Sequence, residues 1–252
     1  MKLTIIGYGK MATALINGLV DEYEIEVVGR DTYKLNALKN IFPKIEIYSI
    51  ENFDIDDKNI ILCVKPQVLS EVSQQFSGRA NSVFSVLAGT TINSLKENIQ
   101  AKSYIRFMPN LGATYLKSMT TITGDINRQE IALDIAKSIG NAIWVNSEKE
   151  LDIATAVAGS GPAYLALVAE ALADGAVKEG LNRDLANNLV AGLFEGFSEL
   201  IKNTHPAVIK DSVMSPAGTT ASGYFALEEG SVRSSFIKAV KSANDRAKEL
   251  GY

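Results

Sequence analysis

The sequence has very few of the residues that form disulfides or bind transition metals. Its 252 residues contain one cysteine, Cys63, and one histidine, His205. One cysteine excludes an intramolecular disulfide framework, and one histidine excludes a metal site built from several histidines. We therefore expect no bound metal and a protein of the reducing cytoplasm.

A run of basic residues is also missing, and the apolar run at the N-terminus is short. The net charge is -4 and no segment concentrates Lys and Arg, so we expect no nucleic-acid partner. The N-terminal apolar run is only a few residues long before it reaches Gly7 and Gly9, which predicts a buried strand and neither a signal peptide nor a membrane span. With 46% hydrophobic and 21% charged residues, the composition is that of a soluble globular protein, and we expect no membrane partner.

The chain has two parts with different hydrophobic patterns. From residue 1 to 147, short β-rich runs such as LTIIG, EIEVVG and NIILCV alternate with helix-like segments, which predicts βαβ units around a mainly parallel sheet. From 148 to 252 no segment has strand character, and long Ala- and Gly-rich segments keep helical periodicity. We predict an α/β fold with a dinucleotide-binding sheet domain at 1–147 and an all-α domain at 148–252.

The helix expected at 161–181 is apolar on nearly every face. Leu165, Val168 and Leu172 lie near one stripe, and alanines such as Ala169 occupy other faces, where they let neighbouring backbones approach closely. Such a helix leaves little surface for water. We therefore predict that the C-terminal domain packs against a second copy of the chain, which makes the protein at least a dimer.

A glycine loop follows the first expected strand. The segment IIGYGKMATAL contains Gly7, Gly9 and Ala12 as G-x-G-x-x-A, and it opens the first expected helix. Gly7 allows a tight turn, Gly9 lets a pyrophosphate approach, and Ala12 allows close helix–strand packing. Free N–H groups at the helix start receive negative charge. A tight βα turn without a ligand is the alternative, but the position within a βαβ unit favours dinucleotide binding.

The end of the second strand indicates which dinucleotide the protein binds. An acidic side chain at this place usually binds a free ribose 2′-OH, but this chain has VVGRD. Gly29 leaves space and Arg30 supplies a guanidinium that suits a 2′-phosphate, whereas Asp31 is a turn or N-cap residue. NADPH is therefore favoured over NADH, which remains possible. The alternative is that Arg30 is only a solvated surface charge.

Three more strand ends are expected along the same crevice, at CVKPQ, LAGTT and RFMPNLGA. Taken singly, each has an ordinary explanation, because Pro66 and Pro109 can terminate strands and Lys65 can face water. Together with the glycine loop, GSGPAY and SPAGTTASGYFALE, in this order and spacing, they resemble pyrroline-5-carboxylate reductase, the last enzyme of proline synthesis. The resemblance covers nearly the whole chain, and GSGPAY and Ser-Pro-x-Gly-x-Thr are its specific parts.

The resemblance implies a Rossmann domain joined to a helical dimerisation domain, with the substrate site at the dimer interface and often a ring of dimers. It also implies a set of cofactor contacts in the first domain, namely Gly7, Gly9, Lys10, Met11, Arg30, Val64, Lys65, Pro66, Ala88 and Gly89. Met108, Pro109 and Asn110 match the strand end beside the nicotinamide. The implied contacts with the substrate carboxylate and ring nitrogen are Ser215, Gly218, Thr219 and Thr220.

Two departures from the family pattern concern these segments. The family usually continues Met-Pro-Asn with Thr-Pro, where this chain has Leu111 and Gly112, so contacts from that loop are uncertain. It often has Ser-Pro-Gly-Gly-x-Thr, where this chain has Ala217. Backbone donation survives the second change because alanine retains its N–H.

The segment from Ser215 to Thr220 has the chemistry of an anion site. With Ser215 as N-cap and Pro216 at the first helical position, the N–H groups of residues 217–219 lack intrahelical partners. Gly218 keeps the approach open, and the hydroxyls add hydrogen bonds. An ordinary Ser-Pro cap explains the first two residues but not the following Gly-Thr-Thr.

This pattern predicts NADPH-dependent reduction of the C=N bond of 1-pyrroline-5-carboxylate to proline. The barrier falls mainly because cofactor and imine are held close and oriented. Thr220 is the predicted catalytic residue, because its hydroxyl is expected to bond the ring nitrogen as imine becomes amine. A threonine hydroxyl is a poor acid, so the substrate reacts as the iminium or receives its proton through water.

Other readings of the chain remain open. His205 is expected to be a loop or capping residue, and Cys63 a small core residue. Reduction of another cyclic imine or of a β-hydroxyacid is the alternative activity, and the latter needs a catalytic lysine, for which Lys178 is the evident candidate. A nucleotide-binding scaffold without catalysis is the alternative outside enzymes, and an assay of NADPH oxidation with the imine separates it.

Overall fold

The computed structural model describes residues 1–250, without the side chain of Leu250. The chain forms two compact units, Met1–Ser160 together with the chain from Ala243 on, and Gly161–Ser242. The last strand of the described residues ends at Trp144, so the expected change to helices alone does occur near residue 147. The compact units divide later, at Ser160, and the domain boundary between 147 and 148 stays a prediction.

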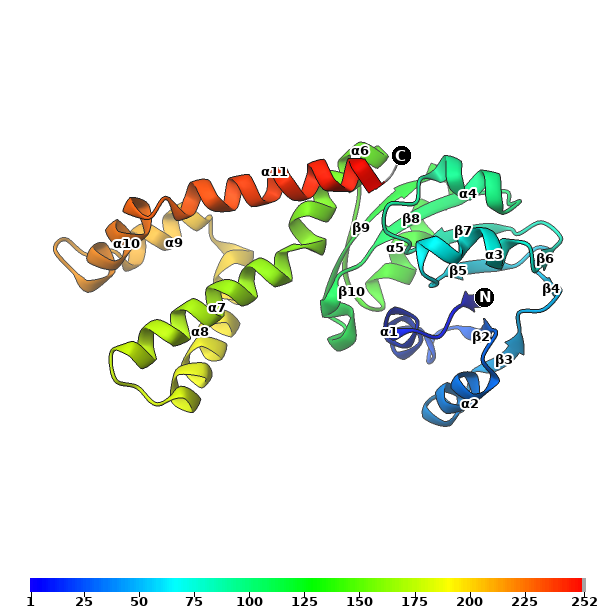
Figure 1. Cartoon of the computed structure of the whole chain (residues 1–252), viewed down its shortest axis with the longest axis horizontal. Coiled ribbons are helices and arrows are strands. Elements are labelled where there is room, and N and C mark those ends of the chain that lie inside the picture. Colours follow the sequence, from blue (N-terminus) through cyan, green and yellow to red (C-terminus); the bar gives the residue numbers. More distant parts are fainter. Residues whose placement is uncertain (251–252) are drawn as a thin grey trace. The chain divides into compact units, whose positions relative to one another are not determined.

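An eight-stranded sheet forms the centre of the first unit (Figure 1). Its strands, in sheet order, are β10 (Gly140–Trp144), β9 (Ser118–Gly124), β8 (Tyr104–Met108), β7 (Ser82–Ser85), β5 (Asn59–Leu62), β1 (Lys2–Ile6), β2 (Glu24–Gly29) and β3 (Glu46–Ser49). All neighbours are parallel except β8 and β9. The mainly parallel sheet is therefore confirmed. A small second sheet pairs β4 (Phe53–Asp54) with β6 (Phe76–Ser77).

Helices connect these strands. They are α1 (Lys10–Leu19), α2 (Thr32–Ile41), α3 (Leu69–Ser73), α4 (Ile92–Asn98), α5 (Gln129–Lys137) and α6 (Glu148–Ala154). Short 3₁₀ turns lie at η1 (Pro66–Val68), η2 (Leu111–Tyr115) and η3 (Ile126–Arg128), and a π-helical turn, η4 (Thr155–Gly159), follows α6. The chain thus alternates strand and helix as the hydrophobic pattern predicts.

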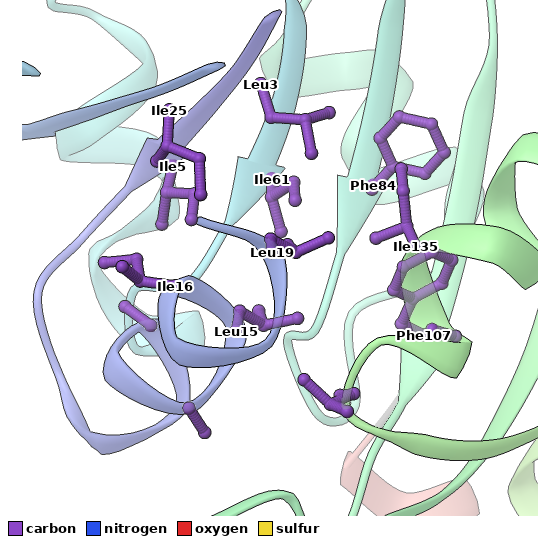
Figure 2. Close-up of a cluster of buried hydrophobic side chains, with 14 of the residues drawn as sticks. Leu3, Ile5, Leu15, Ile16, Leu19, Ile25, Ile61, Phe84, Phe107 and Ile135 are labelled. Carbon is purple, nitrogen blue, oxygen red and sulfur yellow. The ribbon is translucent and has the colours of Figure 1, made fainter. Parts of the chain in front are cut away.

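The core has two clusters, and β1 contributes to both. Leu3 and Ile5 pack with Leu15 of α1 in one cluster, which Figure 2 shows together with Ile135 of α5. Ile6 packs in the other cluster with residues such as Leu95 of α4. A parallel strand covered by helices on both faces is apolar at nearly every position, which explains the short continuous run LTII.

The second unit consists of helices α7 (Gly161–Lys178), α8 (Arg183–Asn203), α9 (Pro206–Val213), α10 (Thr219–Glu229) and the beginning of α11 (Val232–Leu250). Helices α7 and α8 pack on each other and leave many apolar side chains exposed, including Leu193 of α8 at 57%, and Phe225 of α10 is 65% exposed. By length and composition alone, the segment Glu148–Lys178 could cross a membrane, and only 11% of its most apolar stretch of 18 residues is buried. The apolar faces of these helices are therefore not covered by other parts of the second unit.

Candidate functional site

A cleft of about 1370 Å³ opens at the carboxyl ends of β1, β2 and β5. Strands β1 and β5 are neighbours, and the chain continues from β1 toward β2 on one side and from β5 toward β7 on the other. Such a reversal of strand order creates the crevice in which open α/β sheets bind ligands. The predicted site residues that line this cleft are Gly7, Gly9, Lys10, Arg30, Val64 and Lys65.

The glycine loop has the geometry that its spacing predicts. Gly7 has φ +116°, and a Cβ atom there would lie 2.7 Å from the carbonyl oxygen of Cys63. Ala12 is fully buried where α1 packs against the core. At Gly9, by contrast, an added Cβ meets no atom within 4 Å, so the backbone borders open space. The tight turn and the close helix packing are therefore confirmed.

The start of α1 suits a phosphate group. Gly9 is the N-cap without a side-chain cap bond, and the first turn contains no acidic residue. The first N–H groups of a helix have no intrahelical partner and carry partial positive charge. The exposed Lys10 adds a full positive charge at the same place. A dinucleotide pyrophosphate fits these donors and the open space beside Gly9.

At the end of β2 a carboxylate from α3 joins the charged residues that the sequence pattern indicates. Arg30 is exposed, and its Nη1 lies 3.2 Å from Oε1 of Glu71. Asp31 caps α2 by accepting from the Lys34 N–H at 3.1 Å, which confirms its expected role. The expectation that Gly29 leaves space for the cofactor is wrong, because a Cβ there would lie 2.4 Å from the Tyr8 ring. The ring itself fills that space.

Several predicted residues are not among those that line the cleft, namely Met11, Pro66, Ala88, Gly89, Met108, Pro109 and Asn110. Their cofactor roles remain predictions. The side chain of Asn110 is occupied by backbone groups, because Nδ2 donates to the Ala158 carbonyl at 3.0 Å and Oδ1 accepts from the Gly112 N–H at 3.0 Å. Asn110 thereby ties the 3₁₀ turn η2 to the π-helical turn η4.

The departure at Leu111 and Gly112 has a structural counterpart. Both lie in η2, and an added Cβ on Gly112 would be 2.5 Å from the Lys117 carbonyl oxygen. Leu111 and Tyr115 of this turn line the cleft. The segment that replaces Thr-Pro therefore still borders the candidate cofactor site.

Sequence reasoning missed further lining residues, among them Tyr8, Lys34, Glu51, Glu71 and Tyr115. Lys34 had a usable signal, because it lies three residues after the predicted cap Asp31 and thus in the first turn of α2. Glu71 and Tyr115 had none, since only the tertiary fold brings α3 and η2 to the ends of β1 and β2.

The segment before α10 differs from the prediction. Ser215 is not the N-cap and Pro216 is not the first helical residue, because α10 begins at Thr219 with Gly218 as N-cap. Ala217 has φ +58°, a left-handed conformation that interrupts the helix, and the Gly218 N–H donates to the Ser215 carbonyl at 3.1 Å. Residues 215–218 therefore form a turn.

This correction moves the free donors. The N–H groups without intrahelical partners belong to Thr219, Thr220 and Ala221, and Thr220 is the second residue of the helix. An added Cβ on Gly218 would lie 2.3 Å from the Ser215 Oγ. The glycine therefore admits the serine hydroxyl next to the start of α10.

The single histidine and the single cysteine have reactive side chains, but both have structural roles. His205 is the N-cap of α9, where its Nδ1 accepts from the Ala207 N–H at 3.2 Å, as expected. Cys63 packs against the core, and burial raises the pKa of its thiol well above the ordinary range. A protonated, partly buried thiol is a poor nucleophile, in agreement with its expected role as a core residue.

Comparisons with known proteins cover both halves of the chain. Residues 148–250 match the family described as pyrroline-5-carboxylate reductase dimerisation, and residues 2–89 match the family described as NADP oxidoreductase coenzyme F420-dependent. A pyrroline-5-carboxylate reductase of Synechocystis is 38% identical over 100% of this chain and 98% of its own length. One from Helicobacter pylori is 35% identical over 94% of this chain and 95% of its own.

Solved structures agree. A pyrroline-5-carboxylate reductase from Coxiella burnetii superposes with a TM-score of 0.87 at 29% identity, over 99% of this chain and 98% of the other. Pyrroline carboxylate reductase from Plasmodium falciparum, a structure with NADP bound, has a TM-score of 0.82 at 28% identity, over 100% of this chain and 98% of the other. Full-length similarity of this kind, on top of the cleft described above, shows that the chain belongs to the pyrroline-5-carboxylate reductase family of oxidoreductases.

Proposed function

We propose that this protein reduces 1-pyrroline-5-carboxylate to proline with NADPH as the hydride donor. The observation that carries the proposal is the cleft beside the glycine loop, where the open side of Gly9, the start of α1 and several cations border one volume. The names of the relatives and the NADP of the Plasmodium structure support the choice of substrate and cofactor.

The cofactor contacts are assigned from the family resemblance, and part of them border this cleft. The pyrophosphate is assigned to Gly7, Gly9, Lys10 and Met11 at the start of α1. The 2′-phosphate is assigned to Arg30, whose exposed guanidinium lies beyond β2. The remaining assigned contacts follow the ends of β5, β7 and β8, namely Val64, Lys65, Pro66, Ala88, Gly89, Pro109 and Asn110.

The substrate is assigned to the beginning of α10. Its carboxylate accepts from the N–H groups of Thr219, Thr220 and Ala221, where the helix dipole favours negative charge. The Ser215 hydroxyl, next to Gly218, supplies a further donor. The Thr220 hydroxyl bonds the ring nitrogen. These contacts hold the carboxylate and the nitrogen of the ring in one orientation.

Bound NADPH supplies the hydride for the C=N carbon. The residues of the chain supply orientation, and they raise the rate because the reacting carbon is held in a near-attack geometry. A threonine hydroxyl does not release a proton near neutral pH, so the ring nitrogen arrives protonated or takes its proton from water. Thr220 stabilises the nitrogen as it becomes an amine, through a hydrogen bond that strengthens along the reaction.

Replacement of Thr220 by Val tests this assignment. The variant keeps the side-chain shape and loses the hydroxyl, so kcat/KM for the imine should fall by roughly 10- to 1,000-fold, measured as NADPH absorbance loss. The affinity for NADPH, measured by fluorescence, should not change. Thr219→Val is the matched control, because the contact assigned to Thr219 is its backbone N–H. Near-normal turnover of Thr220→Val beside an inactive Thr219→Val would refute the assignment.

We further propose that the protein is a cytoplasmic homodimer, with a ring of dimers as a higher assembly. Exposed apolar side chains on α7, α8 and α10, with few buried residues in this unit, support a second copy as their cover. The same cover accounts for the apolar segment Glu148–Lys178 without a membrane. Sedimentation in detergent-free buffer at micromolar concentration tests the proposal, and a fully active monomer would contradict it.

A further inference from the structure

An ion pair crosses the cleft beyond the end of β2. Arg30 follows β2, and Glu71 lies in α3, forty-one residues further along the chain. The Arg30 Nη1 is 3.2 Å from the Glu71 Oε1, and both side chains line the cleft. They are 69% and 65% exposed, so the pair is accessible to a ligand in the cleft.

The second cation at this end is also paired. The Lys34 Nζ lies 3.5 Å from Oδ2 of Asp31 and stands over the Tyr8 ring at 5.8 Å from its centroid. The other charged residues that line the cleft are Lys10 and Lys65 among the cations and Glu51 among the acids. Of the groups around the 2′-position, Glu71 is thus the carboxylate in direct contact with the guanidinium assigned to the 2′-phosphate.

Arg30 and Glu71 favour different cofactors, because Arg30 suits the 2′-phosphate of NADPH and Glu71 suits the 2′-OH of NADH. A 2′-phosphate bound to Arg30 needs the guanidinium that Glu71 holds, and it is repelled by the same carboxylate. A ribose 2′-OH, in contrast, is a good donor to a carboxylate, which is the usual way in which such folds bind NAD. The acid that is missing from the end of β2 is therefore supplied by α3.

We propose that Glu71 is a specificity-determining residue that weakens the preference for NADPH and lets the cleft accept NADH. This inference rests on the proposed role of Arg30 as the 2′-phosphate contact. An exposed ion pair contributes little to stability, so Arg30 exchanges Glu71 for a phosphate readily. The carboxylate that is displaced stays close to the phosphate, and its charge lowers the affinity.

Replacement of Glu71 by Gln keeps the shape and removes the charge. One unit charge at ~5 Å from a phosphomonoester in a solvated site corresponds to roughly 3- to 10-fold in affinity. We expect the dissociation constant of 2′,5′-ADP to fall by about this factor, measured by titration calorimetry on the full-length protein. The dissociation constant of 5′-AMP, which carries a 2′-OH, should rise, because an amide oxygen is a weaker acceptor than a carboxylate. The KM ratio of NADH to NADPH should increase accordingly.

Three further variants separate the possible results. Arg30→Ala should weaken the binding of 2′,5′-ADP and reduce the gain from Glu71→Gln in the double variant, because the competition for the guanidinium is then lost while the repulsion between carboxylate and phosphate remains. Glu51→Gln removes the same charge from the same cleft and should change 2′,5′-ADP affinity less than twofold. Thermal unfolding followed through Trp144, the chain's single tryptophan, should be unchanged in all of them.

The outcomes distinguish this inference from the proposed function. If Arg30→Ala leaves 2′,5′-ADP affinity unchanged, the assignment of the 2′-phosphate to Arg30 fails. If Arg30→Ala weakens binding but Glu71→Gln does not strengthen it, only the role of Glu71 is overturned. An equal gain from Glu51→Gln also overturns that role, because the effect then reports the general charge of the cleft.

Discussion

The loss of Arg106 should destabilise the first compact unit. Arg106 lies in the middle of β8 and is only 4% exposed. Its Nη1 is 2.8 Å from Oε1 of Glu148, and its Nη2 is 3.7 Å from Oδ1 of Asp152, both on α6. The same Glu148 oxygen accepts from the Ile92 N–H of α4 at 2.9 Å. One buried guanidinium therefore connects a central strand with two helices.

The size of the effect follows from burial. Removal of one partner from a buried ion pair costs about 3–5 kcal/mol, because the other charge remains without compensation. Glu148 and Asp152 are 33% and 28% exposed, so water recovers part of this energy. We therefore expect Arg106→Met, which keeps the apolar stem, to lose about 3 kcal/mol. Arg106→Lys keeps the charge but not the two-pronged geometry, and should lose about 1–2 kcal/mol.

The pH dependence gives a second signature. Burial raises the pKa of Asp152 above its ordinary value, and Arg106 opposes this rise. Without Arg106 the pKa of Asp152 should rise further in the folded state. A carboxyl with a raised folded pKa stabilises the fold more as pH falls, so the difference between wild type and Arg106→Met should narrow from pH 7.5 to 5.

Urea unfolding at both pH values measures these differences. Trp144 is the single tryptophan and lies partly buried in β10, so its fluorescence reports on the first unit. Glu148→Gln is the control, because it keeps a partner for the Ile92 N–H while it removes one charge. A loss below 1 kcal/mol in Arg106→Met, or a difference independent of pH, would refute the electrostatic reasoning.

Three other substitutions have clear expected results. Ala217→Gly should stabilise the turn before α10 by about 0.5–1 kcal/mol, measured by hydrogen exchange, because relief of the left-handed strain at φ +58° exceeds the added unfolded-state entropy; slower exchange in wild type would contradict this. Gly7→Ala should destabilise the loop by about 2 kcal/mol or more and lower NADPH affinity at least tenfold in a fluorescence titration, since its Cβ meets the Cys63 carbonyl; wild-type affinity would disprove it. Glu26 is buried, which raises its pKa, but bonds from Lys58, Thr4 and Lys2 outweigh this and hold the pKa below normal. A lowered folded pKa adds stability above the unfolded value of about 4.3 that is lost as pH falls, so the stability lost in Glu26→Gln should shrink below pH ~4 in acid titrations, and a constant loss would argue against it.

Local patterns were sufficient for most of the fold. The β1 run LTII is apolar because both faces of a parallel strand are covered, and α8 is one of the helices that the periodicity after residue 148 predicts. The glycine loop was equally clear, since Gly7 needs a positive φ that few other residues adopt. The start of α10 was misplaced, because Ser-Pro is a good helix start in isolation and only the turn at Ala217 reveals the later beginning.

The sequence by itself determined the alternation of strands and helices, the dinucleotide loop and the family, because these depend on residues that are neighbours in the chain. The tertiary structure alone decided which charges from distant parts of the chain meet. Glu71 reaches Arg30, and Arg106 reaches Glu148, across 41 and 42 residues of intervening chain. No periodicity encodes such pairs, because they depend on the order in which the strands assemble in the sheet and on the direction in which each connection leaves it.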